Sequence, residues 1–494
     1  MKNFKRYLKF LLPILFIIMV LFKYEIINIK ADNVQKFDLK SKLIPLKTTK
    51  AGNGFEDLNK LQEILKDKKI VAMGEATHGT KEFFEMKHRF FEFLVEKMGY
   101  RIFAIEAESG GTQDVNDYIL NGTGNAKDAV KSMKFWTWST EEVVDMVEWM
   151  RMYNKNPEHK RKIKFYGFDM QSADKNSSRI LDYVKKVDNN NFPKFKEKLL
   201  YVDNQMYSLS NERLNGLEKD TEELKSIFQQ NKQNYVKKTS ISEYEKVYQD
   251  LNIVIQCVKF SKMAKGKDLK EASIVRDYYM AQNVKWILNY EKQFGNDKIM
   301  LWAHNGHVTK KSSIYKSMGE NLKDMFKDEF YSIGFDFYKG SFRAIPCNNS
   351  GKTFGYTPAK FKVDKSASNS FEYSFEKTGI PLSFMDFKFA SEDKNIAKWL
   401  SQKQLTHSVG AVYNGNIEQF VMPEVPIESY DGLIFVKETS AAVGIEGYQT
   451  GIINGDTITF VYRNIYKIVV PFILIIILII GMYIYKNKKA KNNM

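Results

Sequence analysis

Histidine and carboxylate side chains follow several short apolar runs of this chain, and their types suit acid–base chemistry. A neutral histidine titrates near physiological pH and can take a proton from water. A carboxylate on its other ring nitrogen would fix the tautomer and stabilise the imidazolium. A second histidine could donate a hydrogen bond to the oxygen that becomes negative when water attacks an ester carbonyl. The residues placed to do this are Glu75, His78, Glu106, His304 and His307.

These roles need no covalent nucleophile. His78 would act with Glu75 or Glu106 as its carboxylate and with His304 or His307 as the second histidine, and the residues alone do not choose between these. The chain contains no G-x-S-x-G motif of a serine hydrolase and no H-E-x-x-H zinc motif. The alternative is a metal-dependent hydrolase or peptidase that uses the same cluster as ligands. Imidazole and carboxylate groups suit zinc or iron even without that motif. A binding protein without catalytic activity is a third hypothesis.

Other residues of these types have more ordinary interpretations. Asp169 follows an apolar run but is expected to be structural, and His304 is as consistent with a core imidazole as with a catalytic group. Trp136 and Trp138 could line a substrate pocket, although tryptophans are more often core residues. We expect no functional role for the remaining histidines, His88, His159 and His407.

The apolar runs themselves predict strands that are buried on both faces. They cover residues 69–73, 101–105, 163–168, 298–303 and 331–335, with a late candidate at 432–436. Helical patterns lie between them, at Lys81–Met98, at Ser139–Met150 and around residues 275–287. This alternation predicts an α/β fold with a parallel sheet and flanking helices.

Two consequences follow for the organisation of the body, residues 32–460. Because ligands bind at the carboxyl ends of parallel strands, the candidate residues should meet at one edge of the sheet. Residues of about 195–265 break the alternation, are rich in charge and glutamine, and predict a helical insertion.

Both ends of the chain predict membrane targeting. Basic residues from Lys2 to Lys9 precede the apolar run 10–22, so residues 1–31 read as a signal peptide or an uncleaved signal anchor. The uncharged stretch Ile468–Tyr485 predicts a transmembrane helix over about 466–485. The lysines of the tail 486–494 place that tail in the cytoplasm and the body outside it.

Charge and cysteine content exclude two further classes. The net charge is +16, but residues 1–31 carry +5 and residues 486–494 carry +4, so the body has a modest surplus of +7 without a basic block. We therefore expect no nucleic-acid partner. Two cysteines, Cys257 and Cys347, cannot form a disulfide framework or a cysteine zinc site.

An ordered set of segments closely resembles the erythromycin esterase family. The segments are GEATHGTKEFFEMKHRFFEFLVEKMGYRIFAIEAE (74–108), FWTWSTEEV (135–143), FYGFDMQ (165–171), RDYYMAQNVKWI (276–287), LWAHNGHV (301–308) and SIGFDFYKGSF (332–342). Together they span most of residues 40–440.

The resemblance implies hydrolysis of a macrolactone ester by activated water, with His78 as general base and Glu75, Glu106 and His304 as its partners. His307, Trp136 and Trp138 are then expected to bind the substrate, a small-molecule ester or lactone. We expect no cofactor, a divalent metal being the alternative. The family's antibiotic-resistance members are soluble intracellular enzymes, whereas both ends of this chain predict a membrane-anchored member. The resemblance therefore predicts the reaction class, ester hydrolysis, but it does not predict that the substrate is an antibiotic.

Overall fold

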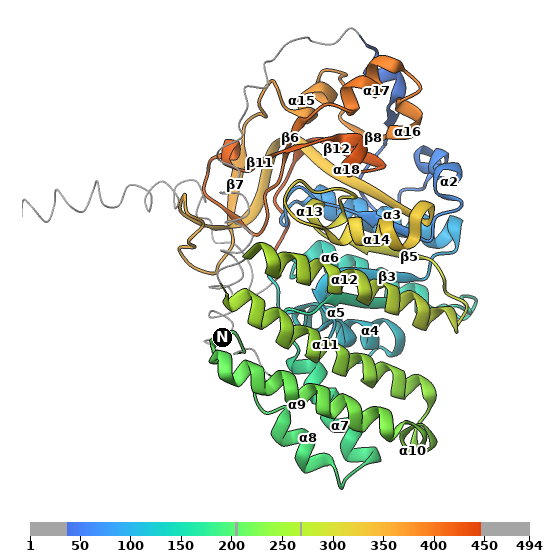
Figure 1. Cartoon of the computed structure of the whole chain (residues 1–494). Coiled ribbons are helices and arrows are strands. Elements are labelled where there is room, and N and C mark those ends of the chain that lie inside the picture. The colour runs from blue at the N-terminus through green and yellow to red at the C-terminus, as the bar shows by residue number, and fades with distance from the viewer. Residues whose placement is uncertain (1–36, 203–205, 267–268, 446–494) are drawn as a thin grey trace, which may run out of the picture.

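A ten-stranded sheet runs through the part of the chain that the computed structural model describes, residues 37–202, 206–266 and 269–445 (Figure 1). Its main path has the order β1-β8-β12-β6-β2-β5-β3-β4, and β7 and β10 pair with β6. The strands are β1 (Ile44–Pro45), β2 (Ile70–Met73), β3 (Ile102–Glu108), β4 (Lys164–Asp169), β5 (Ile299–Trp302), β6 (Phe330–Pro346), β7 (Ala359–Val363), β8 (Leu382–Asp386), β10 (Val412–Tyr413) and β12 (Gly432–Thr439). Two further strands, β9 (Gln404–His407) and β11 (Val421–Glu424), form a separate antiparallel pair.

The six apolar runs of the sequence form six adjacent strands, β12, β6, β2, β5, β3 and β4, which are parallel to one another. The sheet as a whole is mixed, where the sequence predicted a parallel sheet. β8 pairs antiparallel with β12 and with β1, and β7 pairs antiparallel with β6. Three strands, β3, β12 and β6, extend beyond the apolar runs that predicted them. β6 continues to Pro346, so Asp336 lies inside this strand and not at its end.

Two layers of helices cover the sheet. One face packs against α2 (Lys60–Leu65), α3 (Lys81–Met98), α4 (Thr112–Asn121), α5 (Ala126–Lys131) and α6 (Glu141–Lys155). The other face packs mainly against α12 (Leu269–Lys292), α14 (Met318–Phe326), α15 (Phe371–Glu376), α16 (Phe387–Ala390) and α17 (Lys394–Leu400). Each face of the sheet has its own hydrophobic core, and successive residues of β2 pack alternately into the two. Val71 and Met73 lie in the first core and Ile70 and Ala72 in the second, as the two-residue period of a strand requires.

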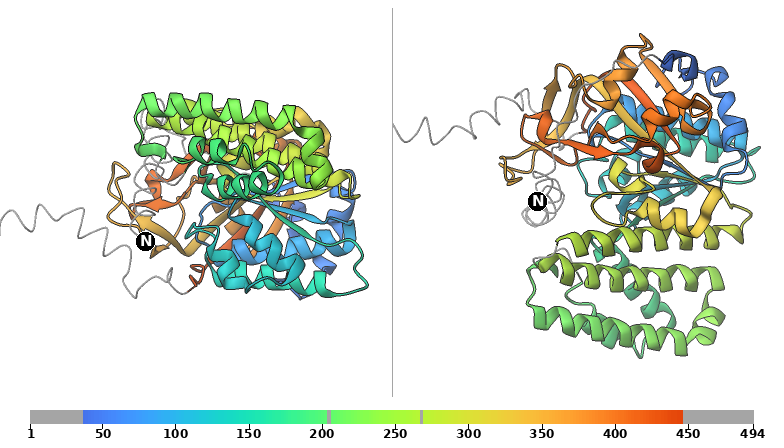
Figure 2. Two further views of the ribbon diagram at one scale, coloured as in Figure 1. Left: turned by 90° about the horizontal axis from the view of Figure 1, so that it is seen from below. Right: turned by 45° about the horizontal axis from the view of Figure 1, so that its top comes forward.

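A stack of helices extends the molecule beyond β4, at the lower end of Figure 1, and the right-hand view of Figure 2 shows it beside the sheet. It contains α7 (Asp174–Val187), α8 (Phe192–Lys198), α9 (Asn211–Gln230), α10 (Lys232–Lys238) and α11 (Ile241–Lys265), around a third hydrophobic core. Helices therefore occupy most of the region that the sequence predicted to be helical. Gln249 and Gln256 of α11 donate hydrogen bonds to Asn283 of α12, both at 3.0 Å, so this stack also supports a helix of the main body.

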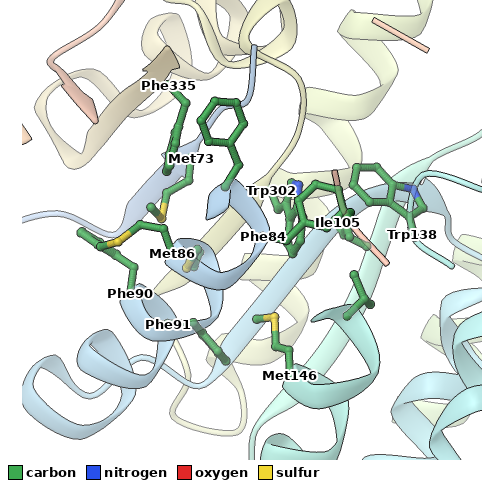
Figure 3. Close-up of a cluster of buried hydrophobic side chains, with 14 of the residues drawn as sticks. Met73, Phe84, Met86, Phe90, Phe91, Ile105, Trp138, Met146, Trp302 and Phe335 are labelled. Atoms are coloured by element: carbon green, nitrogen blue, oxygen red, sulfur yellow. The ribbon is translucent and has the colours of Figure 1, made fainter. Parts of the chain in front are cut away.

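Helix α3 packs tightly against the sheet because its apolar positions form one broad face. It ends at Gly99, whose φ of 76° lies in the left-handed region that glycine adopts without strain. Figure 3 shows the core beneath it, where Phe84 lies against Trp302 with ring centroids 4.8 Å apart. Trp138 packs on the same indole at 5.5 Å. The loop that enters α3 is therefore attached to a rigid element.

The predicted signal segment 1–31, transmembrane helix 466–485 and tail 486–494 lie outside the described residues. Among the described residues, no helix is long and apolar enough to cross a membrane.

Candidate active site

The loop that joins β2 to α3, residues 74–80, is fixed by backbone contacts at both ends. Gly74 has no room for a side chain, because a Cβ there would lie 2.1 Å from Oδ1 of Asn305. Gly79 is equally confined by the Arg343 backbone, whose N–H donates to the Gly79 carbonyl at 3.0 Å. Between them, the Ala76 carbonyl accepts a 2.7 Å hydrogen bond from the Val409 N–H. The loop is thus held against three separate segments of the chain.

This loop places His78 against Glu75. Nδ1 of His78 lies 2.7 Å from Oε1 of Glu75, and both side chains are buried. The second carboxylate oxygen of Glu75 accepts hydrogen bonds from Nζ of Lys87 at 2.8 Å and from Nε1 of Trp302 at 2.7 Å. Glu75 is therefore fixed in orientation on both oxygens, and it fixes the imidazole in turn. Among the described residues, Nε2 of His78 has no hydrogen-bond partner.

Lys87 is a lysine in an apolar environment. It is fully buried on α3, and its Nζ lies 4.6 Å from the ring centre of Trp302 and 4.8 Å from that of Phe335. Burial lowers the pKa of Lys87 to about 8, despite the opposing attraction of Glu75. Its ammonium group faces the carboxylate that supports His78.

His304 faces His78 across the site, with ring centroids 4.9 Å apart. Its Nδ1 accepts a hydrogen bond from the Gly306 N–H at 3.2 Å, as the N-cap of α13 (Asn305–Val308). The proton of the neutral ring must then sit on Nε2, which is shielded from solvent and faces the Val409 backbone. Burial and the adjacent His78 lower the pKa of His304 to about 3. His304 is thus neutral, with its N–H directed at the Val409 backbone.

Glu106 organises the other half of the site. It lies within β3, beyond the point where the register with β4 shifts, and not after the strand as the sequence predicted. One oxygen accepts the backbone N–H of His304 at 2.9 Å. The other accepts a 2.8 Å hydrogen bond from Arg276 and lies 3.2 Å from Nε2 of His307. Burial alone would raise the pKa of Glu106, but His307 and Arg276 hold it well below its usual value.

His307 and Arg276 are themselves held by carboxylates. Nδ1 of His307 lies 2.9 Å from Oδ1 of Asp277, and Arg276 donates to Asp169 at 2.7 Å. Burial would lower the pKa of His307, but Asp277 and Glu106 raise it to about 10. His307 therefore favours its charged form at neutral pH, and its Nε2 lies 3.2 Å from Oε1 of Glu106 and 3.1 Å from Nη1 of Arg276.

The two predicted tryptophans occupy different positions. Trp138 meets His78 edge-on, with ring centroids 5.9 Å apart, and its Nε1 donates to the Glu106 carbonyl at 3.0 Å. Trp136 lies farther along the loop, with its ring centre 5.6 Å from the guanidinium carbon of Arg343. Both are almost fully buried.

The structure thus brings Glu75, His78, Glu106 and His304 together from the carboxyl ends of three strands. Sequence analysis missed the residues that support them, which are Lys87, Trp302, Arg276 and Asp277. Lys87 had a detectable signal, because it falls on the stripe 83, 87, 90 and 94 of an otherwise apolar helix face. Asp169, interpreted as structural, lies against Arg276.

A separate cleft lies away from this site, between α4, α7, α11 and α12. Charged side chains line it, including Arg179, Lys186, Glu243 and Lys246, and it contains none of the residues predicted to be catalytic.

Comparison with known proteins agrees with the geometry. Residues 95–439 match the model of a family described as erythromycin esterase. The chain belongs to the erythromycin esterase family. Glu75 and His78 lie just before the matched range. Family membership supports hydrolase activity.

Two relatives are similar in sequence over most of their length. Erythromycin esterase type II of Escherichia coli is 26% identical over 396 residues, which cover 72% of this chain and 89% of the relative. The putative hydrolase YbfO of Bacillus subtilis (strain 168) is 26% identical over 436 residues, 81% of this chain and 90% of the relative.

Solved structures show the same fold. A Bacillus cereus protein superposes with a TM-score of 0.72 at 26% identity and covers 83% of this chain and 98% of its own. A succinoglycan biosynthesis protein reaches 0.70 at 23% identity, covering 82% of this chain and 96% of its own. A mutant of the erythromycin esterase EreC reaches 0.59 at 15% identity, covering 81% and 96%.

Proposed function

We propose that the protein hydrolyses a carboxylic ester of the macrolactone type with a water molecule that His78 activates. The observation that supports this most directly is the arrangement of three side chains. His78 has Glu75 on Nδ1 and an unused Nε2, and the neutral His304 faces it with its Nε2–H near the Val409 backbone. A base and an oxyanion donor thus meet at one place.

The reaction follows from these positions. Nε2 of His78 takes a proton from water as the water oxygen attacks the ester carbonyl carbon. The carbonyl oxygen becomes an oxyanion, which accepts the Nε2–H of His304. Glu75 stabilises the imidazolium of His78. The carbon–oxygen bond of the ester then breaks, and the leaving alkoxide takes the proton from His78, which restores the neutral base.

A neutral His304 suits this role better than a charged one. With its pKa lowered to about 3, His304 keeps the same protonation state throughout the pH range of ester hydrolysis, as does the neutral histidine donor known from other enzymes. Glu106 and His307 are positioning residues in this scheme, because their polar atoms are engaged with Arg276, Asp277 and the His304 backbone. We therefore assign His307 to support of Glu106, in place of the substrate contact that the sequence suggested.

Hydrolysis of a panel of macrolactones and simple carboxylic esters by the full-length protein tests this proposal. We expect release of the free acid, and a turnover lower by about 10²–10⁴-fold in His78→Ala, the usual contribution of a positioned base. His78→Gln should be nearly as slow, because an amide cannot take the proton. Hydrolysis that survives in both variants would overturn the assignment of His78.

The metal-dependent alternative receives less support from the donor atoms. Glu75, His78, Glu106 and His304 do not converge as a three-ligand group in the described part of the chain. The carboxylate oxygens of Glu75 and Glu106 are instead taken by Lys87, Trp302, Arg276 and the His304 backbone amide. Activity that disappears on chelation, returns with metal and depends on Glu75 as a ligand would favour this alternative.

We also propose that the catalytic body lies outside the cytoplasm, tethered to the cell membrane. Support comes from the sequence alone, namely the basic and apolar segment 1–31 and the apolar stretch before the lysines of residues 486–494. Protease added to intact cells or protoplasts should degrade the body. Full protection of the protein, with the protease shown to be active, would contradict this topology.

A further inference from the structure

A second group of buried histidine and carboxylate side chains lies apart from the catalytic residues. Asp336 comes from the middle of β6, Glu372 from α15, and His407 from the end of β9. Each is at most 2% exposed. Nδ1 of His407 lies 2.8 Å from Oδ1 of Asp336, and its Nε2 lies 3.5 Å from Oε1 of Glu372. We call these three residues the β6 triad.

The two carboxylates of the β6 triad differ in how well they are supplied with hydrogen bonds. Asp336 accepts the backbone N–H of Phe337 at 2.8 Å and that of His407 at 3.3 Å. Glu372 is completely buried, yet neither of its carboxylate oxygens has a hydrogen-bond partner among the described residues. Within the same residues, no lysine or arginine forms an ion pair with Asp336 or Glu372. A buried carboxylate without such partners is costly, and the cost is removed when the group is neutralised, paired or bound to a metal.

We propose that the β6 triad binds one divalent transition-metal ion of the zinc class, through an oxygen of Asp336, an oxygen of Glu372 and a ring nitrogen of His407. This site is separate from the catalytic cluster, and the proposal stands whether or not the protein is an esterase.

The dimensions of the triad fit such an ion. One potential ligand atom from each residue can be chosen so that all three lie within 4.8 Å of one another. A tetrahedral ion with bonds of about 2.0–2.2 Å holds its ligand atoms roughly 3.3–3.6 Å apart. The separations of 2.8 Å and 3.5 Å are measured from opposite ring nitrogens of His407, Nδ1 to Asp336 and Nε2 to Glu372. An ion held by one of these nitrogens therefore requires the carboxylate on the other side of the ring to move towards it. One imidazole and two carboxylates are donors that zinc, manganese and iron accept, with zinc favoured over the other two by intrinsic affinity.

An ion in the β6 triad would brace the catalytic loop. Phe335, next to Asp336, exchanges two hydrogen bonds with the side chain of Asn305, the neighbour of His304. Two residues after His407, the Val409 N–H donates to the Ala76 carbonyl between Glu75 and His78. Binding would therefore fasten β6, α15 and β9 together at a point one or two residues from the active site.

Metal content of the full-length protein tests the proposal. The protein is stripped with chelator, incubated with zinc chloride and dialysed, and zinc is then measured per chain. We expect one zinc in the wild type and at least a hundredfold weaker binding in Glu372→Gln and in His407→Asn. Glu108→Gln, which changes a buried carboxylate on β3 outside the triad, is the matched control and should retain the ion. Glu75→Gln should also retain it.

A measurement on the wild type covers the case in which a triad variant fails to fold. Cobalt(II) added to the stripped protein should give the absorption of a four- or five-coordinate ion, and X-ray absorption of the zinc form should show nitrogen and oxygen ligands without sulfur. A wild-type protein that takes up no zinc or cobalt, or a Glu372→Gln variant that binds zinc as tightly as the wild type, would overturn the proposal. Loss of zinc in Glu75→Gln alone would move the site to the catalytic cluster and so favour the metal-dependent mechanism.

Discussion

The catalytic cluster and the β6 triad are built from the same residue types but differ in how their charge is balanced. In the catalytic cluster, Glu75 has the ammonium of Lys87, and Glu106 has the guanidinium of Arg276. In the β6 triad, His407 alone faces two carboxylates, and Glu372 has two unpartnered oxygens. A cluster whose carboxylates are all paired can hold a histidine ready for proton transfer. A cluster with spare acceptors is suited to bind a cation.

The same contrast occurs between two histidines that are only three residues apart. His304 has no carboxylate on its ring, and its pKa falls to about 3, whereas His307 lies between Asp277 and Glu106, and its pKa rises to about 10. One is therefore neutral, and the other favours its charged form at neutral pH. Their spacing in the sequence carries no sign of this, because the carboxylates that decide it come from other elements.

The strongest test of the comparison is Glu75→Gln. If Glu75 holds and stabilises the imidazolium of His78, turnover on the best ester should fall by about 10³–10⁴-fold, as for removal of the carboxylate behind other catalytic histidines. The measurement is kcat, with circular dichroism to confirm folding. The double variant with His78→Ala should lose far less than the product of the two single losses, because the pair acts as one unit. A loss below tenfold would show that Glu75 is not part of that unit.

The sequence was sufficient for the parallel core of the sheet and for the site that it positions. Each of the six apolar runs became a strand, because runs buried on both faces leave no polar face to suggest another structure. The rule that ligands bind at strand ends then brought Glu75, His78 and His304 to one edge. The antiparallel strands β7 and β8 were missed. Buried and exposed residues alternate along β7, and β8 is only five residues long, so neither contains a continuous apolar run like those of the six parallel strands.

The supporting residues could not be assigned from the sequence for a different reason. Arg276 and Asp277 lie within a helix, and only the packing of α12 against the strand ends turns them towards Glu106 and His307. His407 was interpreted as ordinary because nothing near it in the sequence suggests a site. Its partners Asp336 and Glu372 are 71 and 35 positions away.

Among the variants that test stability, we expect the largest loss in free energy of unfolding when the guanidinium of Arg276 is removed. Arg276→Met leaves the buried carboxylates of Glu106 and Asp169 without their shared partner, so the free energy of unfolding should fall by about 3–5 kcal/mol. Urea denaturation at neutral pH measures it. Lys175→Met, which breaks the half-exposed pair with Asp114, is the control and should cost at most about 1 kcal/mol. Equal losses in the two variants would contradict the paired arrangement.

The Lys87–Glu75 contact predicts a pH effect on turnover. Because the pKa of Lys87 is lowered to about 8, its ammonium loses its proton as the pH rises through that value, and Glu75 loses its charged partner. Wild-type kcat should therefore decline above about pH 8. Lys87→Met should be slower at pH 7 by about 10–100-fold, as for other residues that orient a functional group. Its pH profile should lack the alkaline decline. If the same alkaline decline in kcat persists in Lys87→Met, a titrating group other than Lys87 causes it.

The smallest effect concerns the charge of His307. Its folded-state pKa of about 10 lies above the ordinary value of 6.5, so between these values the native state holds a proton that the unfolded state has released. The stabilisation is complete below pH 6.5 and is lost as the pH rises towards 10. The difference in free energy of unfolding between the wild type and His307→Asn should thus shrink with pH above 6.5. The slope should be roughly 1 kcal/mol per pH unit, because one pKa unit corresponds to about 1.4 kcal/mol and Glu106 shares the titration. Urea denaturation from pH 6 to pH 9 measures both curves. Parallel curves would mean that His307 is neutral, and the contrast with His304 would then disappear.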